Sequence, residues 1–175
     1  DEVINNFATH IEVELLDIDT VQITDNGRGI PVDPHPKFKN KSALEIILTT
    51  LHSGGKFNSE NYQTSGGLHG VGASVVNALS DKFVIEVIRE KKIYRQEYSK
   101  GLPITKLLKV SETTKTNGTK VLFTPDREIF GENVFFSPKI LFSIIKNKAY
   151  LSPGVKIHWK CNDAIVNDEK IPNNN

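Results

Sequence analysis

The sequence predicts an α+β domain, a two-layer sandwich in which helices cover one face of a mixed, mostly antiparallel sheet. Three observations indicate this class. Segments that alternate apolar and polar residues, as half-buried strands do, recur along the chain. Short turns join some of them, and segments with the apolar spacing of helices lie between. The 175 residues, 38% of them apolar and 25% charged, are expected to form a single domain over residues 1–175 with a substantial core.

Composition restricts the classes of function. A net charge of +1 gives no global argument for binding nucleic acid or a membrane, although a local basic patch such as Lys91, Lys92 and Arg95 is compatible with it. The single Cys161 excludes an internal disulfide and suits a reducing compartment. There is no membrane-length apolar run and no signal peptide, so we expect a cytoplasmic protein. The chain contains no Met and is expected to be an excised piece.

The first half of the chain predicts a hairpin and two helices. Residues 10–24, "HIEVELLDIDTVQIT", alternate as two strands joined by an acidic turn. Ser42 and Glu45 form a capping box for a helix that Gly54 ends. Its apolar stripe is Leu44, Ile47, Leu48 and Leu51. Residues 53–64 are polar and predict a surface loop of the kind that forms lids, and residues 71–79 predict a second helix.

The second half predicts strands and one more helix. Residues 82–90, 92–99 and 118–125 are strand-like and suggest an antiparallel meander. A helix opens at Ser137 and Pro138, and a last strand covers 155–161. The expected buried face of this helix is Ile140, Leu141, Ile144 and Ile145. We expect Leu44, Ile144, Ile145 and Trp159 in the core, without a functional role.

One glycine-rich segment suggests a phosphate site. In "SGGLHGVGASVVNAL", residues 65–79, Gly67, Gly70 and Gly72 precede an apolar helical stretch. Glycines let backbone N–H groups turn toward an anion, and a helix N-terminus adds partial positive charge. The order G-x-x-G-x-G differs from the dinucleotide fingerprint and from the Walker pattern, which disfavours both of those nucleotide folds.

A second cluster, "TDNGRGIP" at residues 24–31, is by itself a common turn sequence. However, Gly27 and Gly29 bracket Arg28 and leave the backbone open to a flat ligand, and Asp25 could accept hydrogen bonds from an exocyclic amine. Glu2 is by default part of a surface turn at the tail of a helix. It becomes interesting only beside a triphosphate, because hydrolysis requires a carboxylate near the attacking water. The five histidines show no zinc spacing with Cys161, so no metal site is predicted.

Together, the acidic pair, D-x-G-x-G, "GGKF" and "GLHGVG" resemble the nucleotide-binding motifs of the GHKL superfamily, whose fold is the Bergerat ATPase sandwich. The longer strings "DNGRGIPVDPHPK", "LHSGGKF" and "SGGLHGVGASVVNALS" are similar to the ATPase domain of the B-type subunits of bacterial type II topoisomerases. This resemblance runs from Asp1 to about Trp159. The residues of these three strings are most similar to the topoisomerase IV branch, and the gyrase branch is the close alternative.

The resemblance implies a role for each matching residue. Glu2 would be the general base that activates water. Arg28 would pair with Glu2 and would flank the adenine ring. Asp25 would bind adenine with the help of Thr119 through an ordered water. Apolar walls would come from Ile30, Pro31 and Ile47, beside the backbone of Gly29, and Arg95 would lie at the outer rim. The phosphates would be held by Lys56, Tyr62, Leu68, His69, Gly70, Val71 and Gly72. His69 would otherwise be interpreted as a polar loop residue.

The resemblance also implies cofactors and partners. ATP would bind with Mg²⁺, whose Asn ligand would fall before Asp1. The family's N-terminal arm and transducer domain lie outside this sequence, so the chain alone is expected to hydrolyse ATP feebly or not at all. In the intact protein, ATP would drive homodimerisation of the B-type subunits around DNA, with the DNA-cleaving A-type subunits as partners. ATP-competitive inhibitors would contact Asp25, Arg28 and Thr119. The alternative is a nucleotide-gated dimerisation module without turnover.

Overall fold

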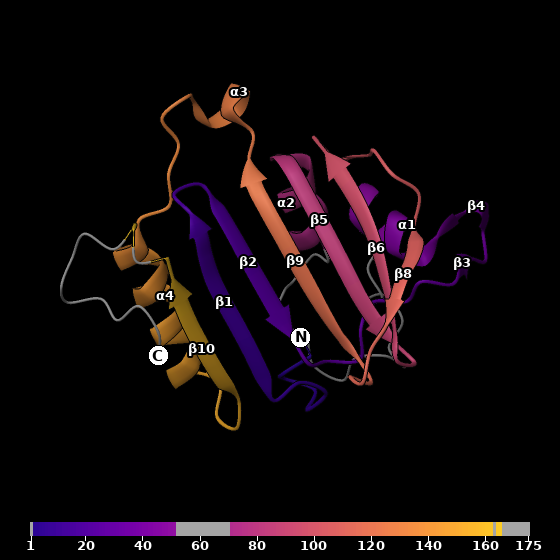
Figure 1. Cartoon of the computed structure of the whole chain (residues 1–175), viewed down its shortest axis with the longest axis horizontal. Helices are drawn as coiled ribbons and strands as arrows, with labels where there is room; N and C mark the ends of the chain where they lie inside the picture. Colours follow the sequence, from indigo (N-terminus) through magenta and orange to yellow (C-terminus); the bar gives the residue numbers. More distant parts are fainter. Residues whose placement is uncertain (1, 52–70, 163, 166–175) are drawn as a thin grey trace.

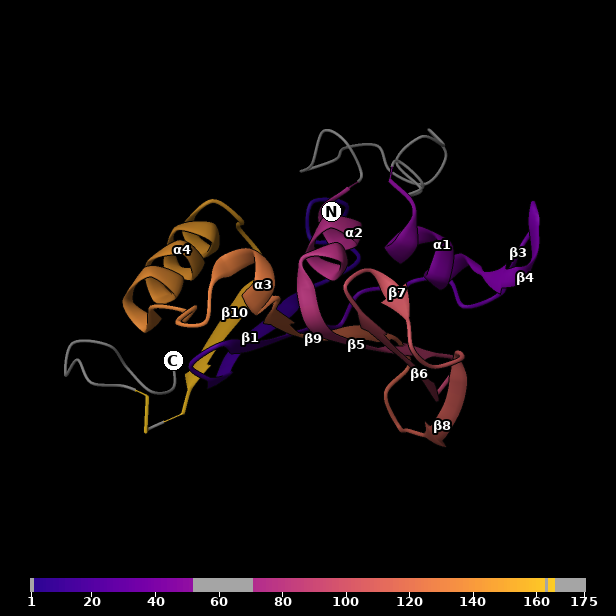
Figure 2. The ribbon, with the colours of Figure 1, turned by 90° about the horizontal axis from the view of Figure 1, so that it is seen from above.

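The computed structural model describes residues 2–51, 71–162 and 164–165. The loop predicted over residues 53–64 and the glycine that was expected to end the first helix lie outside these residues. Within them, a large sheet carries all the helices on one face, as the edge-on view shows (Figures 1 and 2). This confirms the predicted class of fold.

Eight strands form the sheet in the order β10-β1-β2-β9-β5-β6-β7, with β8 also pairing with β6. Only β1 and β10 run parallel; the other pairs are antiparallel. The strands are β1 (His10–Asp17), β2 (Thr20–Asp25), β5 (Ser80–Arg89), β6 (Lys92–Ser99), β7 (Leu102–Pro103), β8 (Leu108–Glu112), β9 (Gly118–Pro125) and β10 (Lys156–Cys161). A separate small hairpin pairs β3 (Pro34–His35) with β4 (Phe38–Ser42).

The predicted meander is wrong in its order. β5 and β6 form the expected hairpin, but β9 pairs with the other edge of β5 and also with β2. The segments β7 and β8 already pair with β6, so β9 crosses to the free edge of β5. This crossing places β2 and β9 side by side at the centre of the sheet (Figure 1).

Four helices are described: α1 (Ala43–Thr49), α2 (Gly72–Ala78), α3 (Arg127–Phe130) and α4 (Pro138–Tyr150). α1 begins as predicted, because the Ser42 Oγ accepts a hydrogen bond of 3.1 Å from the backbone N–H of Glu45. α3 was not predicted. It is tied to the β1–β2 turn by an ion pair of 2.9 Å between Arg127 and the buried Asp19. Within the described residues, no helix is long and apolar enough to cross a membrane.

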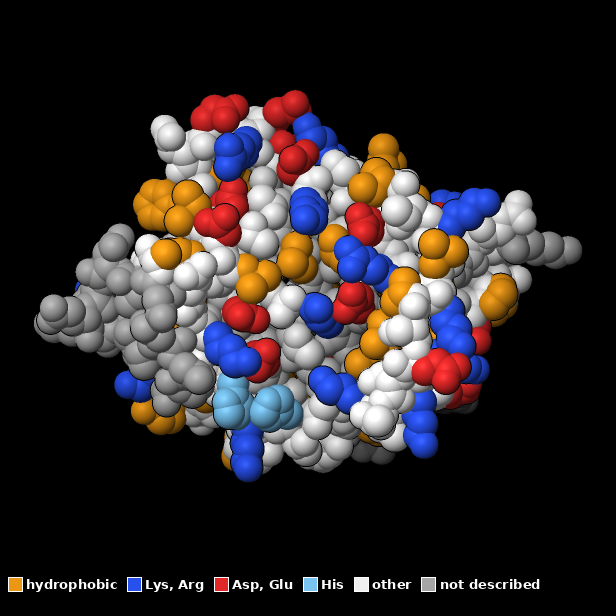
Figure 3. All heavy atoms as spheres, viewed as in Figure 1, with side chains coloured by type: hydrophobic (Ala, Val, Ile, Leu, Met, Phe, Trp, Pro, Cys, Tyr) orange, Lys and Arg blue, Asp and Glu red, His pale blue; other side chains and the backbone are white. Residues whose placement is uncertain are grey.

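Alternation along the strands gives the sheet two different faces. In β5, Phe83, Ile85 and Val87 are almost fully buried toward α1 and α2. Lys82 and Glu86 take the opposite phase and lie on the face without helices, where charged and apolar side chains are interspersed (Figure 3). One face therefore holds the core, and the other is a mixed polar surface.

The core has two parts on the helix-covered face. One is Leu44, Leu48, Phe83, Ile85, Val87 and Tyr98, below α1 and α2. The other is Val13, Leu15, Val21, Trp159 and Cys161, against α4. Phe123 of β9 packs against both. Between them lies the end of β2, and Ile23 is 38% exposed there although its strand is central.

Two of the expected buried faces are corrected. Ile140 and Ile144 of α4 are 61% and 51% exposed, while Leu141, Phe142 and Ile145 pack against the core. The sequence offers two neighbouring apolar stripes on this helix, and only one of them can face the sheet. In α1, Leu51 lies beyond the helix end and is 59% exposed, because the helix ends at Thr49.

Residues 2–7 have the hydrogen bonds of a helix C-terminus. The N–H of Phe7 donates to the carbonyl of Glu2 at 2.7 Å, and the N–H of Asn6 donates to the carbonyl of Val3 at 2.9 Å. Asn6 has a φ of 62°, the left-handed conformation that Asn tolerates. This is the Schellman arrangement of a helix C-terminus, in agreement with the predicted helix tail. It turns the chain toward β1 and leaves Glu2 and Phe7 beside the end of β2.

Candidate functional site

The candidate site lies where β2 ends, beside the N-terminal segment (Figure 1). Asn26, directly after β2, ties the two together. Its Oδ1 accepts hydrogen bonds of 2.9 Å from the backbone N–H groups of Thr9 and His10, and its Nδ2 donates to the Thr9 hydroxyl at 3.0 Å. The segment that carries Glu2 and Phe7 is thereby held beside the loop that follows Asp25.

Asp25 points to the helix-covered face. It pairs in register with Thr119 of β9, and Ile23 pairs with Val121 on the same face. The Asp25 Oδ1 accepts a hydrogen bond of 2.8 Å from the N–H of Gly27. A half-buried acceptor thus stands beside an apolar floor made by Ile23 and Val121.

Gly27 lets two carboxylates approach the same point of the backbone. It is buried, and a Cβ atom there would lie 2.9 Å from the Asp25 Oδ1 and 2.9 Å from the Glu2 Oε2. Real Cβ atoms do not approach so closely, so any larger residue would displace one carboxylate. The glycine predicted to leave room for a ligand also leaves room for this pair.

Arg28 holds Glu2. The Arg28 Nη2 donates to the Glu2 Oε1 at 2.9 Å, and its Nε donates to Oε2 at 3.2 Å. The backbone N–H of Arg28 adds a third bond to Oε2, at 3.0 Å. The guanidinium also lies over the ring of Phe7, 3.6 Å from its centroid. The structure therefore brings together Glu2 and Arg28, as the resemblance implied, and adds Phe7.

Arg89 is a site residue that sequence reasoning missed. It is at the end of β5, and its Nη1 donates to the carbonyl of Gly29 at 3.0 Å. Gly29 has a φ of +75° and lies against the Ile88 carbonyl, where a Cβ would be at 2.7 Å. The sequence contained a sign of this role. Arg89 follows Phe83, Ile85 and Val87 at every second position of the strand, so it points to the buried face, where a charged residue is unusual.

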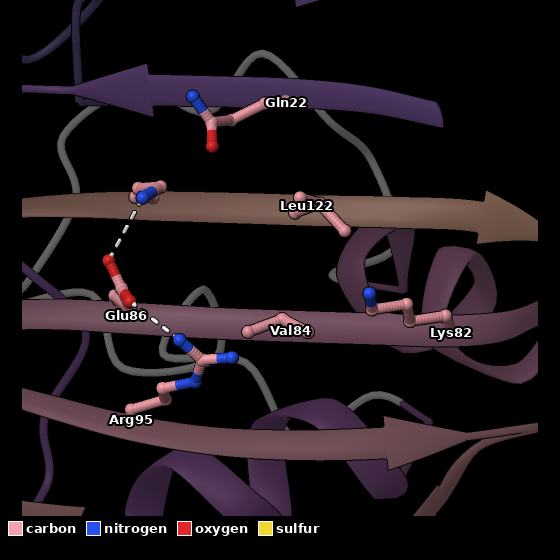
Figure 4. A pocket seen from close by; sticks show the side chains of 7 residues that line it. Gln22, Lys82, Val84, Glu86, Arg95 and Leu122 are labelled. Atoms are coloured by element: carbon pink, nitrogen blue, oxygen red, sulfur yellow. Dashed lines mark hydrogen bonds and ion pairs between the residues drawn. The ribbon is translucent and has the colours of Figure 1, made fainter. Parts of the chain in front are cut away.

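The structure does not bring Arg95 to this site. Arg95 lies opposite Glu86 in the β5–β6 register, on the face of the sheet that carries no helices. It donates to Glu86 at 3.3 Å and to Glu97 at 2.8 Å, and lines a shallow pocket there with Gln22, Lys82, Val84, Lys120 and Leu122 (Figure 4). Strand alternation decides this: the arginine beside the Asp25 site is Arg89, on the opposite face from Arg95.

The expected apolar walls differ in their exposure. Ile30 is half-buried and packs against the core below α1, and Pro31 is exposed. Ile47 is half-buried on α1, whereas its neighbours Ile46 and Leu48 face the interior. All three remain candidates for contact with a ligand.

The phosphate-binding prediction falls mostly outside the described residues, which exclude Lys56, Tyr62, Leu68, His69 and Gly70. Val71 and Gly72 are described at the start of α2. Among the residues that the structure describes, none has an atom within 4 Å of the position where a Cβ of Gly72 would be. Their role in binding phosphate stays a prediction. Nowhere in residues 2–51, 71–162 and 164–165 do three or more His, Cys, Asp or Glu side chains form a group suited to a metal ion.

The electrostatics of the site raise the pKa of Asp25. Burial raises the pKa of the Asp25 carboxyl above its ordinary value of 3.8, and the charge of Glu2 raises it further. The N–H groups of Gly27 and Thr119 act in the opposite direction. The folded chain therefore binds this proton more tightly than the unfolded chain, so ionising Asp25 costs stability.

This sign gives a pH-dependent expectation for Asp25→Asn. The Asp25 contribution is fully favourable below the ordinary pKa and is lost as the pH rises through the raised pKa of the folded state. We expect Asp25→Asn to gain stability relative to the natural chain as the pH increases from acid to neutral. Urea unfolding of both chains across this range measures the difference. A difference independent of pH, or larger in acid, would contradict the expectation.

The site combines a pair of carboxylates with a glycine-containing loop on the helix-covered face of a mixed sheet, and this combination agrees with an ATPase family. The chain matches the family described as histidine kinase-, DNA gyrase B-, and HSP90-like ATPase over residues 1–129, and it belongs to this family.

Among its relatives, the chain is 51% identical over 170 residues to the B subunit of DNA topoisomerase 4 of Bartonella bacilliformis, an alignment that covers 97% of this chain and 25% of that protein. It is 47% identical over 170 residues to the B subunit of DNA gyrase of Thermotoga maritima, with 97% and 26% covered. A solved structure of the 43K ATPase domain of Thermus thermophilus gyrase B, in complex with an aminocoumarin, superposes with a TM-score of 0.77 at 40% identity. That match covers 92% of this chain and 39% of the solved one. The chain spans about a quarter of the length of the curated relatives.

Proposed function

We propose that this chain is the ATP-binding domain of a type II DNA topoisomerase of the topoisomerase IV kind, belonging to its B-type subunit, and that the intact protein hydrolyses ATP. The observation that carries the proposal is the pair of carboxylates at Gly27: Asp25 faces an apolar floor, and Glu2 is fixed by Arg28. The similarity to the topoisomerase 4 relative along nearly the whole chain supports it.

Adenine recognition follows from the surroundings of Asp25. A carboxylate accepts hydrogen bonds from the exocyclic amine of adenine, and Ile23 and Val121 offer a flat apolar surface beside it. Thr119, opposite Asp25, would assist through an ordered water. Ile30, Pro31, Ile47 and the Arg89–Gly29 contact would complete the walls of this pocket. An aminocoumarin, which the Thermus protein binds, would compete for the same place.

Hydrolysis would use Glu2. Water attacks the γ-phosphorus and the bond to the bridging oxygen of ADP breaks, while a proton of the water passes to the Glu2 carboxylate. The backbone N–H groups of residues 68–72, with Lys56 and Tyr62, would bind the phosphate oxygens. Mg²⁺ bound with the nucleotide would neutralise phosphate charge, and its protein ligand would be the Asn that the resemblance assigns upstream of Asp1.

In the intact protein, ATP binding would close a dimer of B-type subunits around one DNA segment, while the A-type subunits would cleave another. DNA gyrase is the second candidate, because the Thermotoga gyrase chain is nearly as similar. Full-length protein reconstituted with its DNA-cleaving partner distinguishes them. Decatenation without negative supercoiling supports topoisomerase IV, and ATP-dependent negative supercoiling supports gyrase.

Nucleotide selectivity tests the proposal on this chain. We expect a non-hydrolysable ATP analogue to bind and the matching GTP analogue to bind much more weakly, because guanine presents an acceptor oxygen where adenine presents the amine. Asp25→Asn should weaken binding of the ATP analogue by about 10- to 100-fold. Calorimetric titration measures both. Asp33→Asn, in the loop that follows the site, is the control and should bind as the natural chain does. Equal binding of the two nucleotides would overturn the adenine assignment.

A further inference from the structure

We propose that Phe7 is a positioning residue for ATP hydrolysis, acting through Arg28 on Glu2. The inference rests on the proposed function, in which Glu2 is the base. It starts from one contact that the motifs do not include: the Arg28 guanidinium lies over the Phe7 ring, 3.6 Å from its centroid.

The Glu2–Arg28 pair needs such support. The side chains of Arg28 and Glu2 are 38% and 25% exposed, so water reaches the pair. An ion pair in that setting is weak, and long side chains in water exchange between rotamers. A base that must meet one water molecule at a fixed place loses efficiency when its carboxylate moves. The two side-chain bonds fix one edge of the guanidinium, but by themselves they leave its faces open to solvent.

Phe7 covers one of those faces. The aromatic ring attracts the cation and excludes water from it, so the guanidinium keeps one plane, and that plane determines where the Glu2 carboxylate lies. The same turn delivers both groups, because the Phe7 N–H donates to the Glu2 carbonyl at 2.7 Å. The left-handed Asn6 then directs the Phe7 ring to one side of Arg28 and leaves the Glu2 carboxylate on its edge.

The ring has no other large role among the residues that the structure describes. Phe7 is 43% exposed and belongs to neither part of the core. A change of this side chain should therefore affect the Glu2–Arg28 pair far more than the stability of the fold. The proposal also predicts which substitution of Phe7 is harmless. Tyr keeps an aromatic face for the guanidinium, whereas Leu keeps the apolar bulk but has no aromatic face.

The test is steady-state ATP hydrolysis by the full-length protein carrying Phe7→Leu or Phe7→Tyr. We expect Phe7→Leu to lower kcat by about tenfold with KM for ATP nearly unchanged, and Phe7→Tyr to keep the natural kcat. Hydrolysis by Phe7→Leu should also fall more steeply with added salt, since the uncovered ion pair is screened. Phe135→Leu, at a phenylalanine that is 68% exposed and remote from the site, is the matched control. An unchanged kcat in Phe7→Leu, or an equal loss in Phe7→Tyr, would overturn the proposal.

A second measurement separates this proposal from the proposed function. In an NMR spectrum of the 175-residue chain, the Nε–H signal of Arg28 should be shifted upfield by the ring and should lose that shift in Phe7→Leu. If the shift and its loss are seen but Glu2→Gln still hydrolyses ATP, the assignment of the base fails while the contact stands. If no shift is seen in the natural chain, the positioning role of Phe7 is wrong whatever Glu2 does.

Discussion

Replacing Glu2 with Gln should reduce ATP hydrolysis by the full-length protein by about 10²- to 10⁴-fold, the usual contribution of a general base. Gln has nearly the same shape as Glu, and its amide oxygen can still accept from Arg28. It cannot take the proton of the attacking water. We therefore expect nucleotide affinity to change by less than about threefold, so that the loss lies in kcat.

Steady-state turnover and calorimetric binding of a non-hydrolysable ATP analogue measure the two quantities separately. Glu12→Gln is the matched control, because Glu12 also forms a short ion pair, 2.7 Å from Lys160, but on the face of the sheet without helices. Its turnover should equal that of the natural protein. If Glu2→Gln keeps more than about a tenth of the natural turnover, Glu2 is not the base, and a nucleotide-binding module with another chemistry, or none, is favoured.

Gly29→Ala should destabilise the chain by about 3 kcal/mol or more and should also remove nucleotide binding. Two costs add at this position. The φ of +75° is strained for any residue with a Cβ, and that Cβ would lie 2.7 Å from the backbone carbonyl of Ile88. A backbone carbonyl inside the sheet cannot move aside, so the loop must shift. The shift would break the Arg89 bond to Gly29 and move Arg28 away from Glu2.

Gly131→Ala separates the two costs. Gly131 has a φ of +90° and a ψ of 158°, but no atom of the described residues lies within 4 Å of its Cβ position. It should lose only the conformational part, about 1 to 3 kcal/mol, and should bind nucleotide normally. Urea unfolding and analogue titration of both variants give the comparison. Equal losses of stability in the two variants would mean that the Ile88 contact does not constrain the loop.

The local elements could largely be predicted, because their signals lie within short windows. The 10–24 hairpin, the Ser42 cap and the β5–β6 hairpin depend on alternation, capping chemistry and a short turn, and all three are found. The order of strands could not be predicted in the same way. β9 joins β2 through pairings between residues about a hundred positions apart, and no local pattern specifies such a partner.

The site shows the same division. The glycines and acidic residues at 24–31 were visible as a cluster, since their spacing along the chain is short. The sequence did not show which arginine joins these residues. Arg89 and Arg95 are close in sequence and equally charged, and only the phase of each strand decides which face each one occupies. The contact of Phe7 with Arg28 was also invisible, because it depends on a left-handed turn at Asn6.

The sequence by itself determined the class of fold, most local elements and the family whose motifs the chain carries, because each rests on residue types at short and regular spacing. Only the tertiary structure decided that Glu2 and Asp25 meet at Gly27, that Arg28 is held between a carboxylate and an aromatic ring, and that Arg95 belongs to the other face. Those facts depend on long-range strand pairing and on which way each side chain points. Chain folding fixes both, and neither can be read from spacing along the sequence.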